Sequence, residues 1–122
     1  MASAHRIEIT PRDGRVEVKI GSTLLADSSR ALVLAETGLV DRYYLPREDV
    51  RMDLLEPTDS ATTCPFKGQA SYWSATVDGA TQRDLAWSYE RPIPEVEEIA
   101  GYLCFYNERV ELRLDGEPAV AG

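Results

Sequence analysis

The fold is decided by residues 69–89, QASYWSATVDGATQRDLAWSY, where two runs of alternating residues flank an Asp-Gly pair. Runs of this length separated by Asp-Gly are typical of a β-hairpin closed by a two-residue turn. We therefore expect antiparallel strands over residues 69–77 and 81–89.

The tight turn also fixes which residues of the two strands face one another. Counting outward from the turn, we expect Ala70 opposite Trp87 and Tyr72 opposite Leu85. Small residues on one strand then leave room for large rings on the other. This register predicts an aromatic wall on one face of the hairpin, with Trp87 mostly buried over Ala70.

A turn that carries functional groups precedes the hairpin, in the sequence Thr62-Thr63-Cys64-Pro65-Phe66-Lys67-Gly68. Proline removes a backbone donor and glycine admits conformations closed to other residues, so we expect Cys64 and Lys67 on a turn that enters a strand. The polar residues 56–61 predict a loop that leads to this turn. The alternative is a small buried cysteine beside a solvated loop lysine, neither with a function.

Two further hairpins are predicted near the ends of the chain. Residues 5–10 and 15–20 alternate around Pro11–Gly14, which predicts one hairpin with a charged and an apolar face. Residues 102–106 and 110–114 predict another, joined through residues 107–109. The residues from Glu117 onward are expected to form a loose tail.

The middle of the chain predicts shorter elements. Residues 31–35 predict a buried strand, and residues 42–45 predict a short strand that stops at Pro46 and is followed by one helical turn. Residues 94–101 predict a short helix, because proline begins the segment, acids follow in its first turn and glycine ends it.

The composition indicates one soluble domain over residues 1–122, since a chain of 122 residues can bury its own core. No apolar run approaches the ~18 residues that span a bilayer, which excludes a membrane protein. The formal net charge of −8 repels phosphate groups, which argues against nucleic acid and anionic membranes as partners. The N-terminus lacks the apolar region of a secretory signal, so we expect a cytoplasmic protein.

Neither a metal nor another cofactor is expected. Two cysteines, Cys64 and Cys104, cannot form a four-thiolate zinc site, and in the cytoplasm they are expected to be reduced. His5 is the only histidine and lies near a chain end, which argues against a histidine metal cage and against a histidine general base.

The chain resembles the bacterial and fungal family known as domain of unknown function 427 over nearly its full length. The resemblance is carried by residues 21–28, 43–50, 64–73, 86–89, 92–95 and 105–106, which read GSTLLADS, YYLPREDV, CPFKGQASYW, AWSY, PIPE and FY. It implies a compact, mainly β domain of two antiparallel sheets that lean together like a tent, with one short helix. A nucleotidyltransferase-like label is sometimes attached to the family, but the chain has no Gly-Ser helix start followed by paired acids.

Two functions of different classes fit the residues. The first is a binding domain for a small metabolite, with an aromatic-walled pocket that has Lys67 and Cys64 at its lip. Its expected ligand-binding residues are Arg42, Tyr44, Lys67, Tyr72, Trp87 and Tyr89. The rings suit a flat or cationic ligand, and the acidity of the chain favours a cation, whereas Arg42, Arg47 and Lys67 could instead surround a carboxylate or phosphate.

The alternative is a small metal-independent enzyme. Cys64 would be the nucleophile, with Lys67 lowering the pKa of the thiol and a tyrosine assisting. The binding domain is favoured because the chain lacks the usual catalytic combinations of histidine, metal ligands and a phosphate-binding glycine loop. A monomer or a homodimer is expected in either case.

Overall fold

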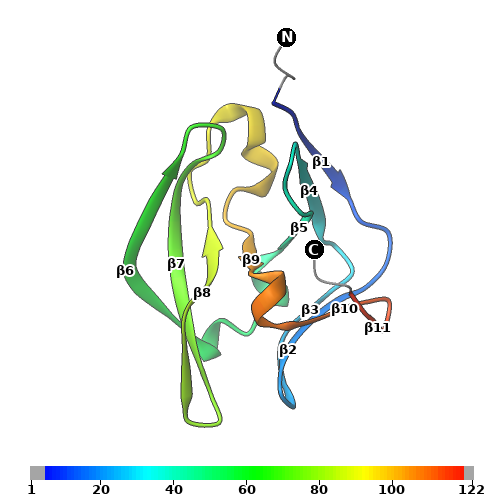
Figure 1. Cartoon of the computed structure of the whole chain (residues 1–122), viewed down its shortest axis with the longest axis vertical. Helices are drawn as coiled ribbons and strands as arrows, with labels where there is room; N and C mark the ends of the chain where they lie inside the picture. The colour runs from blue at the N-terminus through cyan, green and yellow to red at the C-terminus, as the bar shows by residue number, and fades with distance from the viewer. Residues whose placement is uncertain (1–4, 120–122) are drawn as a thin grey trace.

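The computed structural model describes residues 5–119, which form two antiparallel β-sheets (Figure 1). The larger sheet has the strand order β1-β4-β5-β9-β8-β7-β6, and the smaller sheet has the order β11-β10-β2-β3. The larger sheet consists of β1 (Ile7–Pro11), β4 (Leu32–Glu36), β5 (Arg42–Leu45), β6 (Leu55–Cys64), β7 (Gly68–Val77), β8 (Ala80–Ser88) and β9 (Leu103–Phe105). The smaller sheet consists of β2 (Val16–Ile20), β3 (Thr23–Ser28), β10 (Glu111–Leu114) and β11 (Glu117–Pro118). The prediction of a mainly β fold with two antiparallel sheets is confirmed.

Short 3₁₀ helices connect the strands. They are η1 (Arg47–Asp49), η2 (Met52–Leu54), η3 (Pro94–Ile99) and η4 (Asn107–Arg109). The helix predicted near residues 94–101 is present as η3, but it is a 3₁₀ helix with a kink at Val96, where φ is −126° and ψ is 28°. The kink lets both Val96 and Ile99 be buried. No helix within residues 5–119 is long and apolar enough to cross a membrane.

Apolar side chains gather on both faces of the larger sheet. On one face, Trp73 and Leu45 pack with Val16 and Leu25 of the smaller sheet. On the other face, a cluster that includes Tyr44, Trp87, Cys104 and Ile99 contains no residue of the smaller sheet. Alternation along each strand explains this division, because Tyr44 and Leu45 are neighbours that point to opposite faces. The central strands β5 and β9 of the larger sheet are therefore covered on both faces, whereas the edge strands β1 and β6 are largely exposed.

The larger sheet is strongly curled. Lys67, in the turn between β6 and β7, forms an ion pair with Glu36 at the end of β4. Strands β4 and β7 are four places apart in the sheet, which would separate them by about 19 Å if the sheet were flat. In Figure 1, β1 and β4 accordingly stand opposite β6, β7 and β8, with η3 close to one end of the space between them. The curl creates an interior face on which side chains from distant strands meet.

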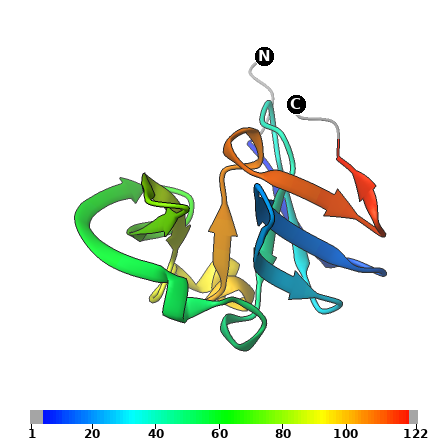
Figure 2. The same cartoon turned by 90° about the horizontal axis from the view of Figure 1, so that it is seen from below.

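The predicted hairpin of residues 5–10 and 15–20 is wrong. β1 pairs with β4 in the larger sheet, whereas β2 pairs with β3 and β10 in the smaller one. The crossing segment between them is fastened by Asp115, which accepts hydrogen bonds from the Arg12 side chain at 3.1 Å and from the Arg15 backbone at 2.8 Å. Figure 2 shows the smaller sheet, drawn in blue and orange, on the other side of β9 from the green hairpin β6–β7.

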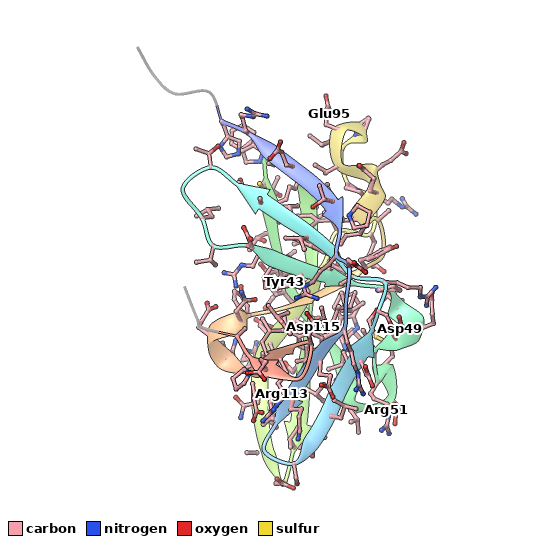
Figure 3. All side chains as sticks on the ribbon, turned by 90° about the vertical axis from the view of Figure 1, so that its right-hand side faces the viewer. Tyr43, Asp49, Arg51, Glu95, Arg113 and Asp115 are labelled. Atoms are coloured by element: carbon pink, nitrogen blue, oxygen red, sulfur yellow. The ribbon has the colours of Figure 1, made fainter. Side chains whose placement is uncertain are left out.

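A second aspartate stabilises the segment in which the chain passes from β3 of the smaller sheet to β4 of the larger one. Asp49 accepts a hydrogen bond at 2.7 Å from Ser28, which ends β3, and pairs at 3.2 Å with Arg30, which lies in the link from β3 to β4. Figure 3 shows Asp115 near the middle of the molecule and Asp49 at about the same height, toward the right-hand edge of the view. The predicted hairpin of residues 102–106 and 110–114 is wrong for a similar reason, since β9 and β10 belong to different sheets.

The hairpin of β7 and β8 is confirmed, but its predicted register is wrong beyond the first pairs. The turn has positive φ at Asp78 (53°) and Gly79 (78°), as a tight hairpin turn requires. Val77 to Ala75 pair as expected, after which β8 contains two extra residues and Trp87 lies opposite Tyr72. Because the shift is two residues, Trp87 keeps the face predicted for it and is 7% exposed.

Three smaller expectations need correction or completion. Residues 56–61 are not a loop but part of β6, which has an irregularity between Pro57 and Ala61. The tail begins with the short strand β11, while residues 120–122 lie outside the described residues, as do residues 1–4 of the N-terminal segment. The strands predicted at residues 31–35 and 42–45 are confirmed as β4 and β5.

Candidate functional site

A pocket of about 400 Å³ opens on the interior face of the curled sheet. Its volume lies near the lower end of the range for small-molecule sites. The lining residues come from β4, β5, β7 and β8, from the loop 38–40, from the turn before β7 and from the positions just after β8 and β9: Leu34, Glu36, Gly38, Leu39, Val40, Arg42, Tyr44, Lys67, Tyr72, Trp87, Tyr89 and Tyr106. The curl of the sheet is what brings these strands around one space.

The walls of the pocket are mostly aromatic. The indole Nε1 of Trp87 donates a hydrogen bond to the hydroxyl of Tyr44 at 3.1 Å, and the two rings meet edge to face. Tyr106 also packs against Trp87, with the two ring centroids 4.6 Å apart. These contacts fix the orientation of the rings before any ligand binds, which lowers the entropic cost of binding.

Burial favours the neutral form of two pocket tyrosines, Tyr44 and Tyr89. Burial raises the pKa of Tyr44 far above its ordinary value. Burial also raises the pKa of Tyr89, with smaller contributions from Cys64 and Tyr72. The hydroxyls of these residues therefore remain hydrogen-bond donors at neutral pH and do not act as bases.

At one end of the pocket a buried ion pair joins Lys67 to Glu36, with Nζ 2.5 Å from Oε1. The two side chains are 10% and 7% exposed. His5 lies on the other oxygen of the same carboxylate, 2.9 Å from Oε2, and its ring stacks on Phe66. The alternative of a solvated loop lysine is therefore wrong. His5, which the sequence placed near a chain end, contacts a side chain of the pocket.

At another part of the wall, the guanidinium of Arg42 lies over two rings. Its central carbon is 5.3 Å from the centroid of Trp87 and 5.6 Å from that of Tyr106. One of its nitrogens, Nη1, is 3.1 Å from Glu108, whose side chain is 54% exposed. Stacking on the two rings and the bond to Glu108 together hold the guanidinium at the pocket wall.

The structure brings together all six residues named in the sequence as ligand-binding. Arg42, Tyr44, Lys67, Tyr72, Trp87 and Tyr89 all line the pocket. Arg47 does not, because it stacks on Trp73 at 5.0 Å and donates to the carbonyl of Gly101 at 3.0 Å. A three-cation cluster of Arg42, Arg47 and Lys67 is thus not formed.

Cys64 is placed beside the pocket and not among its lining residues. It ends β6, is partly buried, and packs against the aromatic cluster on this face of the sheet. The ammonium group of Lys67, which was expected to lower the pKa of this thiol, is bound to Glu36. The other cysteine, Cys104, is fully buried, and that burial raises the pKa of its thiol.

Sequence reasoning missed four contributors to the site. Glu36 ends β4 and the loop 38–40 follows it, and neither was named as a site residue. Tyr106 was interpreted as a strand residue and as part of the family pattern. His5 was missed because it is distant in sequence from its partner Glu36. No local pattern predicts these contacts, since each depends on how far the sheet curls.

A shallower groove adjoins the pocket and shares Tyr72 and Tyr106 with it. Its other lining residues are Ser60, Ala61, Thr62, Asp84, Glu108 and Arg109. Within residues 5–119, no three His, Cys, Asp or Glu side chains gather closely enough to hold a metal ion. The lining residues can interact with a ligand through ring stacking, hydrogen bonds and the charges of Arg42 and of the Lys67–Glu36 pair.

Comparison with known families agrees with the pattern in the sequence. The model of the family described as a domain of unknown function (DUF427) matches residues 8–116. No curated protein gives a significant match to the chain.

Proposed function

Since the chain belongs to the DUF427 family, whose description states no activity, we propose from the pocket itself that this protein is a small-molecule binding domain. The planar part of the ligand lies against the aromatic wall formed by Trp87, Tyr72 and Tyr106. The Lys67–Glu36 pair closes one end of the site, and the loop 38–40 forms part of its lip.

The observation that supports the proposal is that the pocket is preorganised. Aromatic side chains at a sheet surface usually pack into a closed core, but here they surround a space of about 400 Å³. Trp87 and Tyr44 are fixed by their mutual hydrogen bond, so that the space does not depend on loose side chains. A rigid, ring-lined cavity with few charges suits a flat organic molecule better than a flexible peptide.

The enzyme alternative, with Cys64 as nucleophile, Lys67 as its activator and a tyrosine as assistant, receives less support. The thiol is outside the pocket lining and the lysine is occupied by Glu36. A cytoplasmic location, a monomeric or homodimeric state and a bacterial origin stay predictions of the sequence and the resemblance.

The test is a fragment screen by thermal shift and by amide NMR, with the pair of variants Tyr72→Ala and Tyr43→Ala. Tyr72 lines the pocket, whereas Tyr43 points to the opposite face of the sheet and packs against the other core cluster. Hits are expected to shift the amides of β5, β7 and β8 around the pocket. Tyr72→Ala should weaken these hits by about 1 kcal/mol, roughly fivefold, through loss of stacking, while Tyr43→Ala should not.

The proposal fails if planar fragments shift no pocket amide at millimolar concentration. It also fails if both tyrosine variants weaken the hits equally, because the effect would then come from a general loss of stability and not from contact with the ligand.

A further inference from the structure

The charged side chains of the pocket identify the class of ligand, an inference that rests on the proposed binding function. Three of the lining residues are charged: Glu36, Arg42 and Lys67. Glu36 and Lys67 are buried against each other at 2.5 Å, so their charges offset within the wall. Arg42 is left as the charge that decides what the pocket attracts.

Arg42 retains unused binding capacity. Its guanidinium has five N–H donors, and among the described residues only one carboxylate, that of Glu108, takes a hydrogen bond from it, through Nη1. Glu108 does not line the pocket; it lies on the adjoining groove and is 54% exposed, where water screens its charge. The Arg42 side chain is only 23% exposed and lies against the two rings, in surroundings where a charge is less screened.

We propose that the pocket selects planar organic acids, with the ring of the ligand among Trp87, Tyr72 and Tyr106 and its carboxylate on the guanidinium of Arg42. The match is both geometric and electrostatic. A guanidinium presents parallel N–H groups that fit a carboxylate, and its stacking on Trp87 holds that fork beside the space for the ligand ring.

An anionic ligand is the opposite of what the overall charge of the protein favours. The net charge of −8 favours a cationic ligand at long range. Inside the pocket, however, the only carboxylate among the lining residues is Glu36, which is already bound by Lys67 and His5. A cationic ligand would have to lie beside Arg42 with no free carboxylate to bind it, which is unfavourable.

The experiment measures the affinities of three probes of the same shape, naphthoate, naphthamide and naphthylmethylammonium, by amide NMR titration. The wild-type protein should bind the carboxylate at least about tenfold more tightly than the amide, as expected for one charge-assisted hydrogen-bonded pair, and the ammonium most weakly. Arg42→Gln should remove the preference for the carboxylate, because the affinity for naphthoate falls much more than the affinity for naphthamide. Arg42→Lys should keep part of the preference, because it keeps the charge but loses the fork.

Arg47→Gln is the matched control. Arg47 also stacks on a tryptophan, Trp73, but it does not line the pocket. Its loss should therefore leave the carboxylate preference intact, although the protein loses the same amount of charge. Amide spectra of each variant without probe show whether the fold is kept.

Two results overturn the inference while the binding function stands: an amide or ammonium probe that binds as tightly as the carboxylate, or a carboxylate preference that persists in Arg42→Gln. If none of the three probes shifts the NMR signal of any backbone amide around the pocket at millimolar concentration, the inference and the proposed function are both wrong.

Discussion

Lys67 shows how the role of one residue changes once its surroundings are known. In the sequence it is a lysine in a turn between proline and glycine, a setting in which most lysines are solvated. In the structure its side chain is 10% exposed and bound to Glu36 of β4, a strand four places from β7 in the sheet. The lysine therefore fastens the curled sheet in addition to lining the pocket.

This position predicts that Lys67→Ala is destabilising, whereas a solvated loop lysine would contribute little to stability. Removing the ammonium group leaves the buried carboxylate of Glu36 with His5 as its remaining partner. The free energy of unfolding should fall by about 3 kcal/mol, which urea denaturation can measure.

The double variant Glu36→Gln, Lys67→Met provides the control, because it removes both charges. It should cost clearly less than Lys67→Ala, since no unpaired charge stays buried. An unchanged stability of Lys67→Ala would show that the ion pair contributes nothing to the fold.

At the scale of elements, the irregularity shared by β6, β7 and β8 explains why the hairpin register departs from simple counting. Asp84 has a positive φ of 49° and lies in the extra residues of β8. Its carboxylate accepts hydrogen bonds from Ser60 at 2.6 Å and from Thr58 at 2.7 Å, within the irregular part of β6. The bulged segments of β6 and β8 are thus held together by one side chain.

Asp84→Asn should therefore change how stability depends on pH. The hydroxyls of Ser60 and Thr58 lower the pKa of Asp84 below its ordinary value of 3.8. A carboxylate whose pKa is lowered by folding stabilises the folded state at pH values above its ordinary pKa. This stabilisation is lost as the pH falls through the pKa of the folded state. The variant should be less stable by about 1 kcal/mol at neutral pH, and its stability should decline less than that of the wild type between about pH 5 and pH 2.

Asp53→Asn is the matched control for this measurement. Asp53 also has a lowered pKa, caused by its hydrogen bonds with Arg51, but both side chains are more than half exposed. Its substitution should leave the unfolding free energy almost unchanged at neutral pH. If Asp84→Asn behaves in the same way, the carboxylate does not stabilise the bulge.

At the scale of the whole molecule, the larger sheet comes close to closing on itself. The segment before β1 reaches the turn between β6 and β7, where the rings of His5 and Phe66 stack with centroids 3.8 Å apart. These contacts join the two ends of the strand order, and the pocket lies on the face that they enclose. Closure protects edge strands and also fixes the width of the space between the walls.

His5→Ala should loosen this closure. The variant loses the stacking on Phe66 and the contact with Glu36, and its stability should fall by about 1 kcal/mol. Hydrogen exchange should accelerate at the amides of β1 before those of β7 and β8, since the edge strand opens locally.

The adjacent variant Arg6→Ala serves as the control. Among the described residues the Arg6 side chain pairs only with Glu8, at 72% and 65% exposure, and the backbone hydrogen bonds of Arg6 with Thr37 do not depend on that side chain. It should leave both stability and exchange nearly unchanged. Equal exchange at β1 in the wild type and in His5→Ala would show that the stacked pair does not fasten the sheet.

The sequence by itself determined the features that depend on neighbouring residues. The Asp-Gly turn, the alternation along β7 and β8, the stop at Pro46 and the proline start of η3 follow from local backbone preferences and from the period of two along a strand. The same alternation placed Trp87 on the correct face despite the register shift. The aromatic and basic residues of the pocket could be named because the resemblance and the hairpin pattern gathered them.

Only the tertiary structure decided which strands pair and which side chains meet. Alternation in β1 and β2 is equally compatible with one hairpin or with two separate sheets, because it specifies a buried face and not a partner strand. The choice is made by non-local contacts such as those of Asp115 with Arg12 and Arg15. The pairing of Lys67 with Glu36 and the approach of His5 depend on the curl of the sheet, which arises from the packing of both its faces and leaves no local signal in the sequence.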